Sequence, residues 1–210
     1  TMGSPLYADW VPEADSPMVA RIRAAGALIV GKTNTPEFGL GSHTLNPVFG
    51  PTRNPWNRER SAGGSSGGAA VALAMHMLPI ADGSDMMGSL RNPAGWNEIY
   101  GFRPTWGWVP SEPVGDVFLH TLASNGPMAR TPDDLALLMD VMSGGDPRLP
   151  LHRGAEKVSP LSTPKSLRLG WLGDWGGAYP MEEGILDTCE AAIATLEGQG
   201  HQVDRLAPPY

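Results

Sequence analysis

Two clusters rich in glycine and serine constrain the fold of this chain more than any other feature. The first is Gly63–Gly68, with the letters GGSSGG, and the second is Gly83–Ser89, with the letters GSDMMGS. Between them, Ala69–His76 has the small residues of a helix, and Leu78–Ala81 reads as a short strand. A chain that makes a sharp glycine-lined turn twice, one helix and one strand apart, can bring a serine from each turn together.

A serine in each of two facing turns suits acyl transfer. The serine hydroxyl is a weak nucleophile and needs a base within reach. The tetrahedral intermediate needs backbone N–H groups aimed at its oxyanion. The segment Met86–Ser89 stands at the expected start of a short helix, where several such donors are free, and Asp85 lies beside it.

The blocks around these clusters resemble those of the amidase signature family. Gly63–Gly68 and Gly83–Ala94 match its two serine motifs. Further matching blocks, in the right order, are Gly31–Phe38, Gly50–Trp56, Tyr100–Thr105 and Gly126–Thr131. The resemblance covers roughly residues 3–145 and is specific because so many blocks recur together.

The resemblance implies a mechanism with two serines and a lysine. Ser89 matches the nucleophile, and Ser65 matches the serine that relays protons and follows a cis peptide bond, here Gly64–Ser65. The implied oxyanion donors are the backbone N–H groups of Met86, Met87, Gly88 and Ser89, and the implied supporting residues are Ser66, Asp85 and Arg91. The substrate is expected to be a small-molecule amide, with no cofactor and no metal.

Two departures from the family pattern stand out. Met87 occupies a position where the family usually has glycine, which tolerates unusual backbone angles and close approach of substrate. No lysine precedes Lys32, whereas the family's catalytic lysine lies well upstream of the bridging serine. Lys32, Lys157 and Lys165 do not match it. We therefore expect the chain to be a segment of a longer protein that is cut at both ends, and to be inactive alone.

Sequence patterns predict an α/β fold, with a mixed sheet covered by helices. Ser16-Pro17 starts a helix that ends at Gly26 and leads into a buried strand over Ala27–Val30. Thr131-Pro132 starts a second helix. Further elements are a strand at Leu167–Leu172, a helix at Ile185–Leu196 and a strand at Gln202–Leu206. We expect residues 1–210 to form part of one incomplete amidase signature domain, with core motifs in 27–131 and a variable polar excursion at 145–166.

Composition excludes several other classes. A net charge of −7 disfavours nucleic acid and anionic membrane surfaces. No apolar run approaches the ~18 residues of a membrane helix. The single cysteine, Cys189, allows no internal disulfide and indicates a reducing, cytoplasmic setting. A homodimer is left open.

Two other motif matches are weaker. Gly26–Thr33 fits the phosphate-loop pattern, but its inner residues are strand-like and no helix follows. Gly64–Gly68 fits the GxSxG pattern of α/β-hydrolases with Ser66 as nucleophile, although no strand precedes it. The five histidines show no metal-ligand spacing.

Other functions remain open within and beyond the resemblance. One is the amidotransferase subunit of the same family, which supplies ammonia for misacylated tRNA and needs partner subunits. Another is a non-catalytic binding module, which the missing lysine favours. Four aromatic side chains, at Trp96, Trp106, Trp108 and Phe118, are candidates for an aromatic pocket, although core packing is the better-supported role.

Overall fold

The computed structural model describes residues 1–154 and 157–208 of the chain. It divides into two compact units, Thr1–Leu161 and Ser162–Tyr210. Residues 155–156 of the polar excursion lie outside the described residues. That both units belong to one domain stays a prediction.

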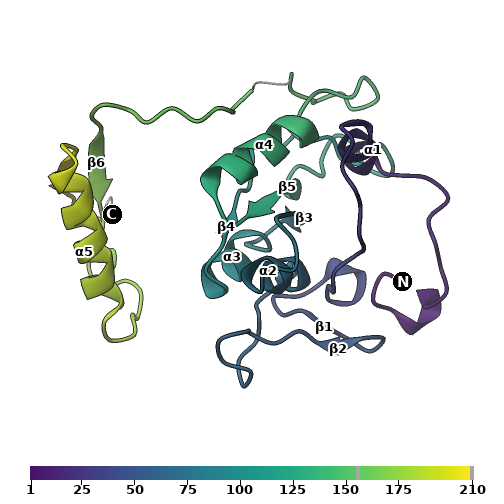
Figure 1. Cartoon of the computed structure of the whole chain (residues 1–210), viewed down its shortest axis with the longest axis horizontal. Coiled ribbons are helices and arrows are strands. Elements are labelled where there is room, and N and C mark those ends of the chain that lie inside the picture. The colour runs from purple at the N-terminus through teal and green to yellow at the C-terminus, as the bar shows by residue number, and fades with distance from the viewer. Residues whose placement is uncertain (155–156, 209–210) are drawn as a thin grey trace. The chain divides into compact units, whose positions relative to one another are not determined.

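The first unit is built on a three-stranded antiparallel sheet with the order β3-β5-β4 (Figure 1). Strand β3 (Ile80–Asp85) pairs with β5 (Ser124–Ala129), with Ile80 opposite Ala129 and Asp85 opposite Ser124. Strand β4 (Tyr100–Gly101) pairs with the other side of β5. A separate two-stranded sheet joins β1 (Leu45–Asn46) to β2 (Gly50–Pro51).

Helices cover both faces of this sheet. One hydrophobic cluster contacts Ile80 of β3 and another contacts Ala81. Because consecutive side chains of a strand point to opposite faces, the two clusters lie on opposite faces of the sheet. On one face, α2 (Gly67–Ala74) and α3 (Arg91–Trp96) pack around Leu73, Leu90 and Met128, with Ala81 against them. On the other, α1 (Pro17–Ala24) and α4 (Pro132–Met142) pack around Met18 and Met139, with Ile80 against them. Short 3-10 turns occupy Pro5–Tyr7 and Glu37–Gly39.

The predicted helix starts are confirmed by their caps. The Ser16 side chain accepts a hydrogen bond from the Val19 N–H at 3.4 Å. The Thr131 hydroxyl accepts one from the Asp134 N–H at 3.1 Å. Each cap satisfies a backbone donor that has no partner inside its helix, which is why these side chains fix where α1 and α4 begin.

The second unit is a strand–helix–strand element. Strand β6 (Arg168–Trp171) runs parallel to β7 (Gln202–Arg205), and α5 (Ile185–Gly198) connects them. The Trp171 indole N–H donates to the Glu190 carboxylate at 2.6 Å and holds the helix against the strand. These three elements confirm the predicted ones, and the α/β class with mixed strand directions is confirmed across the two units. Every helix among the described residues is too short or too polar to span a bilayer.

The predicted buried strand at Ala27–Val30 is wrong. These residues are assigned to no strand, and Leu28 and Val30 are 90% and 75% exposed. A strand needs a neighbour that pairs with its backbone, and no strand of the described residues lies alongside this segment. The apolar pattern alone therefore did not decide its structure.

Candidate active site

The first serine cluster makes a turn that packs against the backbone of His43 and Thr44. A side-chain carbon at Gly64 would lie 2.7 Å from the His43 nitrogen, so only glycine fits there. The Thr44 N–H donates to the Gly63 carbonyl at 3.0 Å. The peptide bond between Gly64 and Ser65 is cis. Ser65 and Ser66 are both 5% exposed, and α2 begins directly after them.

The structure brings the two serine clusters together. The Ser66 N–H donates to the Ser89 carbonyl at 3.2 Å. The Ser66 hydroxyl bridges both backbone groups of Ser84, donating to its carbonyl and accepting from its N–H, each at 3.3 Å. Ser66 is therefore the residue that ties the first turn to β3 and to the second turn.

The two hydroxyls with predicted chemical roles are unengaged. Within the described residues, neither the Ser65 nor the Ser89 hydroxyl has a hydrogen-bond partner. The two hydroxyls do not bond each other directly. Backbone groups of these turns are thus engaged, while the two hydroxyls have no partner among the described residues.

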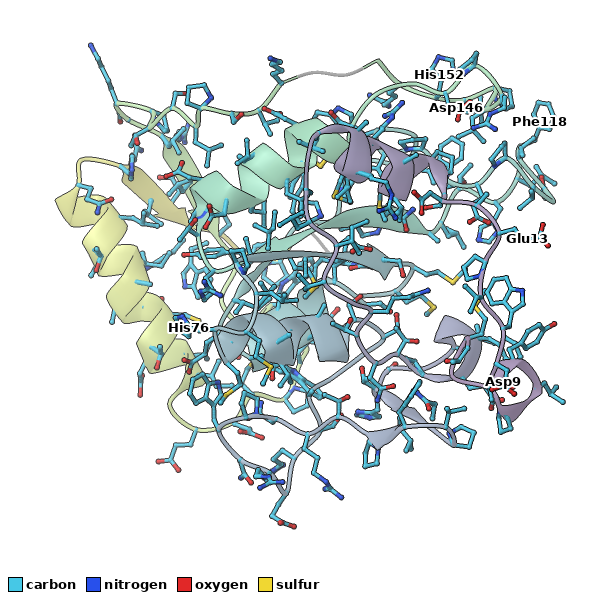
Figure 2. All side chains as sticks on the ribbon, turned by 45° about the vertical axis from the view of Figure 1, so that its right-hand side comes forward. Asp9, Glu13, His76, Phe118, Asp146 and His152 are labelled. Atoms are coloured by element: carbon cyan, nitrogen blue, oxygen red, sulfur yellow. The ribbon has the colours of Figure 1, made fainter. Side chains whose placement is uncertain are left out.

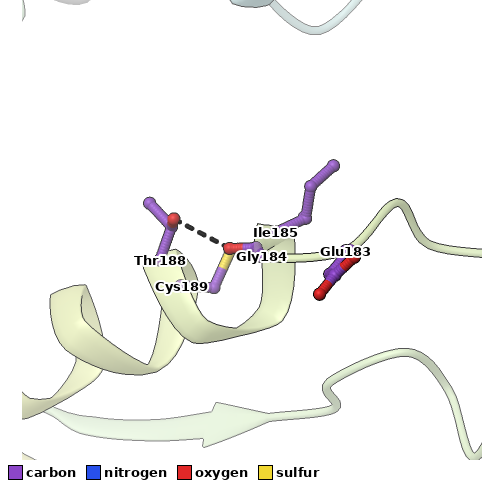
Figure 3. Close-up of a pocket in the computed structure, with 5 residues that line it drawn as sticks. All are labelled: Glu183, Gly184, Ile185, Thr188 and Cys189. Carbon is purple, nitrogen blue, oxygen red and sulfur yellow. Dashed lines mark hydrogen bonds between the residues drawn. The ribbon is translucent and has the colours of Figure 1, made fainter.

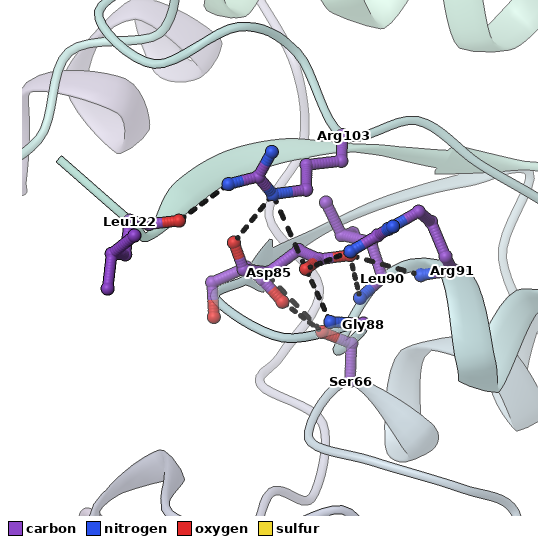
Figure 4. Close-up of polar contacts among 8 residues, drawn as sticks. Ser66, Asp85, Gly88, Leu90, Arg91, Arg103 and Leu122 are labelled. Atoms are coloured by element: carbon purple, nitrogen blue, oxygen red, sulfur yellow. Dashed lines mark hydrogen bonds and ion pairs between the residues drawn. The ribbon is translucent and has the colours of Figure 1, made fainter. Parts of the chain in front are cut away.

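Asp85, at the end of β3, organises the second turn (Figure 4). Its carboxylate is fully buried and accepts hydrogen bonds from the N–H groups of Gly88 at 2.7 Å and Leu90 at 3.2 Å. The Arg91 guanidinium binds it in two-pronged fashion, at 2.9 and 3.1 Å. The Arg103 Nε lies 3.5 Å from the same carboxylate and donates to the Asp85 carbonyl at 3.3 Å.

These donors set the charge state of Asp85. Burial would raise the pKa of the carboxyl, but the hydrogen bonds from Arg91 and from the Gly88 and Leu90 N–H groups outweigh it and lower the pKa to about 2. Asp85 is therefore a fixed anion at neutral pH. Its hydrogen bonds to the Gly88 and Leu90 N–H groups hold the turn, and a carboxyl of such low pKa is a poor proton acceptor.

The lowered pKa predicts an acid-dependent loss of stability. The folded pKa lies below the ordinary value of 3.8, so the stabilisation is complete above about pH 4 and is lost as the pH falls towards 2. Urea unfolding at about pH 5 and pH 2.5 checks this, with Asp85→Asn as control because other carboxyls also titrate in acid. An equal acid-induced loss in both proteins would contradict the assignment.

The free donors of the second turn differ from the expected set. The Gly88 N–H is already bonded to Asp85, whereas no described residue accepts a hydrogen bond from the N–H groups of Met86, Met87 or Ser89. Gly88 has φ +112°, and a side chain there would meet the Asn92 amide at 2.7 Å, so this position requires glycine. Met87 is not among the described non-glycine residues with positive φ, and it is 85% exposed. The position where the resemblance predicts glycine is thus occupied by Met87 without entry into the left-handed region.

Arg103 is a residue of this site that the sequence reasoning missed. Besides Asp85, it donates from Nη2 to the Leu122 carbonyl at 2.6 Å and so ties the segment before β5 to the turn. The only signal available was its place inside the block Tyr100–Thr105 that resembles the family.

The aromatic side chains divide between packing and exposure. Trp108 packs against the core cluster of α1 and α4, and Trp106 is half-buried. Trp96 is 49% exposed with its ring centroid 6.0 Å from that of His43, and Phe118 is 64% exposed. Among the described residues, no two of these four rings form an aromatic pair.

Within the part of the chain that the structure describes, the serine turns coincide neither with a metal centre nor with the surface depression at the start of α5. Among the described residues, no three histidine, cysteine or acidic side chains group as metal ligands would, and His76 and His152 lie far apart (Figure 2). An open depression of about 460 Å³ lies at the start of α5, lined by Glu183, Gly184, Ile185, Thr188 and Cys189 (Figure 3). It belongs to the second unit and contains no predicted site residue.

Comparisons with known proteins agree with this architecture. A glutamyl-tRNA(Gln) amidotransferase subunit from Mycobacterium tuberculosis is 39% identical over the whole chain. A bacterial aryl acylamidase of the amidase signature family is 34% identical, with a TM-score of 0.81 over 95% of this chain and 42% of that one. The 6-aminohexanoate cyclic dimer hydrolase is 32% identical, with a TM-score of 0.85 over 96% of this chain and 43% of that one.

The chain spans 44% of the length of the mycobacterial relative. The Amidase family matches it from end to end, over residues 1–210. The order of its blocks, the two joined serine turns and these comparisons agree, and the chain belongs to the amidase signature family.

Proposed function

We propose that this chain carries the serine pair of an enzyme that hydrolyses the C–N bond of a small carboxamide. Ser89 is the nucleophile, Ser65 relays its proton, and the accepting lysine lies outside these 210 residues. The observation that carries the proposal is the junction of the two turns. At this junction the Ser66 N–H donates to the Ser89 carbonyl at 3.2 Å, Ser65 is buried, and no described residue accepts from the N–H groups of Met86, Met87 and Ser89.

The proposed reaction follows from these groups. Neutral lysine takes the Ser65 proton as Ser65 takes that of Ser89, and the Ser89 oxygen attacks the amide carbon. The oxyanion accepts hydrogen bonds from the N–H groups of Met86, Met87 and Ser89, which are the donors left free. The relay returns a proton to the leaving nitrogen as the C–N bond breaks. The same relay then takes a proton from water, whose oxygen attacks the acyl carbon; the ester bond to Ser89 breaks, its oxygen regains the proton, and the carboxylic acid leaves.

The remaining residues hold this geometry. Asp85 anchors the Gly88 N–H and thereby orients the turn that carries Ser89. Arg91 and Arg103 neutralise the buried carboxylate, and Ser66 joins the two turns. Donors fixed in advance in this way need no rearrangement when the oxyanion forms, and this is the main source of their effect.

The proposal predicts different activities for the chain alone and for a completed fold. The isolated 210-residue chain should release no ammonia or amine from carboxamides above background, because it lacks the base. A chimera in which it replaces the matching segment of the Thermotoga maritima amidotransferase subunit, 32% identical over the whole chain, should regain turnover. The flanking segments alone are the control. Turnover by the isolated chain would contradict the role given to the outside lysine.

The amidotransferase subunit is the second candidate, and the 39% identity to the mycobacterial relative favours it. Such a subunit would release ammonia from an amide donor for use by a partner. Both candidates share the chemistry on Ser89 and differ in whether turnover depends on partner subunits. Activity of the chimera that rises only when the Thermotoga partners are added would favour this second candidate.

A further inference from the structure

The hydroxyl of Thr44 lies within hydrogen-bond distance of three backbone groups of the first serine turn. Thr44 is 1% exposed. Its hydroxyl lies 2.9 Å from the Gly63 carbonyl and 3.2 Å from the Ser65 carbonyl, and it accepts the Gly67 N–H at 2.9 Å. One buried oxygen thus contacts the turn before Ser65, at Ser65 and at the start of α2.

The single proton of the Thr44 hydroxyl can be donated to the Gly63 carbonyl or to the Ser65 carbonyl. Only one of these two carbonyls has another hydrogen-bond donor in the described part of the chain. The Gly63 carbonyl already receives the Thr44 N–H at 3.0 Å. The Ser65 carbonyl has no other donor among the described residues. A buried carbonyl without a partner is costly, so the proton satisfies most groups when it points to Ser65. Thr44 then accepts from Gly67 and donates to Ser65 at the same time.

The fit around this hydroxyl is close. A side-chain carbon at Gly67 would lie 2.3 Å from the Thr44 oxygen, so the helix start and the hydroxyl occupy adjoining space. Residue 66, between the two groups that Thr44 bonds, donates its N–H to the Ser89 carbonyl. The placement of Thr44 is therefore transmitted to both serine turns through consecutive residues of one chain segment.

We infer that Thr44 is a positioning residue, which fixes the backbone of Ser65 and, through Ser66, its register against Ser89. This inference rests on the proposed function, because it assigns Thr44 a part in the same relay. With the carbonyl of Ser65 held, only side-chain rotation remains to place its hydroxyl. Catalytic groups need such support, since a displacement of about 1 Å can cost on the order of 10²-fold in rate.

Amide hydrogen exchange in the 210-residue chain tests the positioning without any activity. In Thr44→Val, which keeps the shape and removes the hydroxyl, the Ser66 N–H should exchange about tenfold faster or more, although Thr44 does not bond it. Thr44→Ser should restore slow exchange. Thr131→Val is the matched control, because it removes a hydroxyl that accepts one backbone N–H at the start of α4. That change should speed exchange at α4 and leave Ser66 unchanged. Unchanged exchange of Ser66 in Thr44→Val would overturn the inference.

Kinetics of the chimera test the catalytic consequence. Thr44→Val should lower kcat by about 10²-fold with KM changed less than about twofold, and Thr44→Ser should recover most of kcat. If Thr44→Val acted only by unfolding the protein, the amount of folded chimera would fall. Folded protein at the wild-type level, with a low kcat that Thr44→Ser restores, therefore indicates positioning. If kcat stays unchanged while Ser89→Ala abolishes turnover, the positioning role is refuted and the proposed function stands. If Ser89→Ala stays active, the proposed function fails, and the exchange result alone decides how Thr44 acts on the turn.

Discussion

Replacing Asp85 with asparagine is expected to lower the free energy of unfolding by about 3–5 kcal/mol, the usual cost of breaking a buried ion pair. The carboxylate accepts from the backbone N–H groups of Gly88, Leu90 and Arg91 and from the Arg91 guanidinium, and it lies beside Arg103. Asparagine offers one oxygen where the carboxylate offers two, and its amide N–H groups would face donors. The guanidinium groups would lose their counter-charge, and one backbone N–H would be left unsatisfied.

Urea unfolding at neutral pH measures this loss, and Asp15→Asn is the matched control. Asp15 also pairs with an arginine, Arg23, at 2.7 Å, but at the surface, where such a pair contributes little. Asp85→Asn should move the unfolding midpoint strongly and Asp15→Asn hardly at all. A loss below about 1 kcal/mol for Asp85→Asn would mean that the network contributes no more than a surface pair. The role of Asp85 in holding the second turn would then have to be abandoned.

The helices of this fold were predictable from local signals, whereas one of its main strands was not. Thr131 and Ser16 mark helix starts because a side chain beside the helix satisfies its first donors. Strand β5 carries glycine and proline at 126 and 127, which sequence rules read as a turn. It forms because Gly126 lets the backbone pass close to the Phe102 carbonyl, 2.2 Å from where a side-chain carbon would stand. Such a contact depends on residues far apart in sequence.

Ala27–Val30 shows the opposite failure. Its apolar run is typical of a buried strand, but burial requires a partner that the described residues do not supply. The local sequence pattern thus predicts a strand at Ala27–Val30 that does not form, and it fails to predict strand β5, which does. In both places the outcome depends on which backbone lies alongside, and that information is not contained in a window of neighbouring residues.

The candidate site divides in the same way. Glycine and serine spacing, with the family resemblance, was enough to select Ser65, Ser89 and Asp85. The network that holds them was not visible in the sequence, because Arg103 reaches Asp85 across 18 positions and Thr44 reaches Ser65 across 21. The hydrogen bond from the Gly88 N–H to the Asp85 carboxylate could not be predicted either, because it depends on the orientation of the Asp85 side chain toward its own turn.

Single alanine replacements of the three serines should separate their roles in the chimera. Ser89→Ala should lower kcat by about 10⁴-fold or more, because no acyl-enzyme can form. Ser65→Ala should lower kcat by about 10²–10⁴-fold, the usual contribution of a positioned proton-transfer group. A serine-directed phosphonate should label wild-type protein at Ser89, and peptide mass spectrometry locates the label.

Ser66→Ala supplies the matched control, since Ser66 is as buried as Ser65 and its hydroxyl is fully engaged with Ser84. Its loss should lower stability and affect kcat less than either other change, because the only proton of this hydroxyl is already donated to the Ser84 carbonyl. If Ser66→Ala alone abolished turnover and labelling while Ser89→Ala did not, the GxSxG reading of the first cluster would be correct. The assignment of the nucleophile to the second turn would then be refuted.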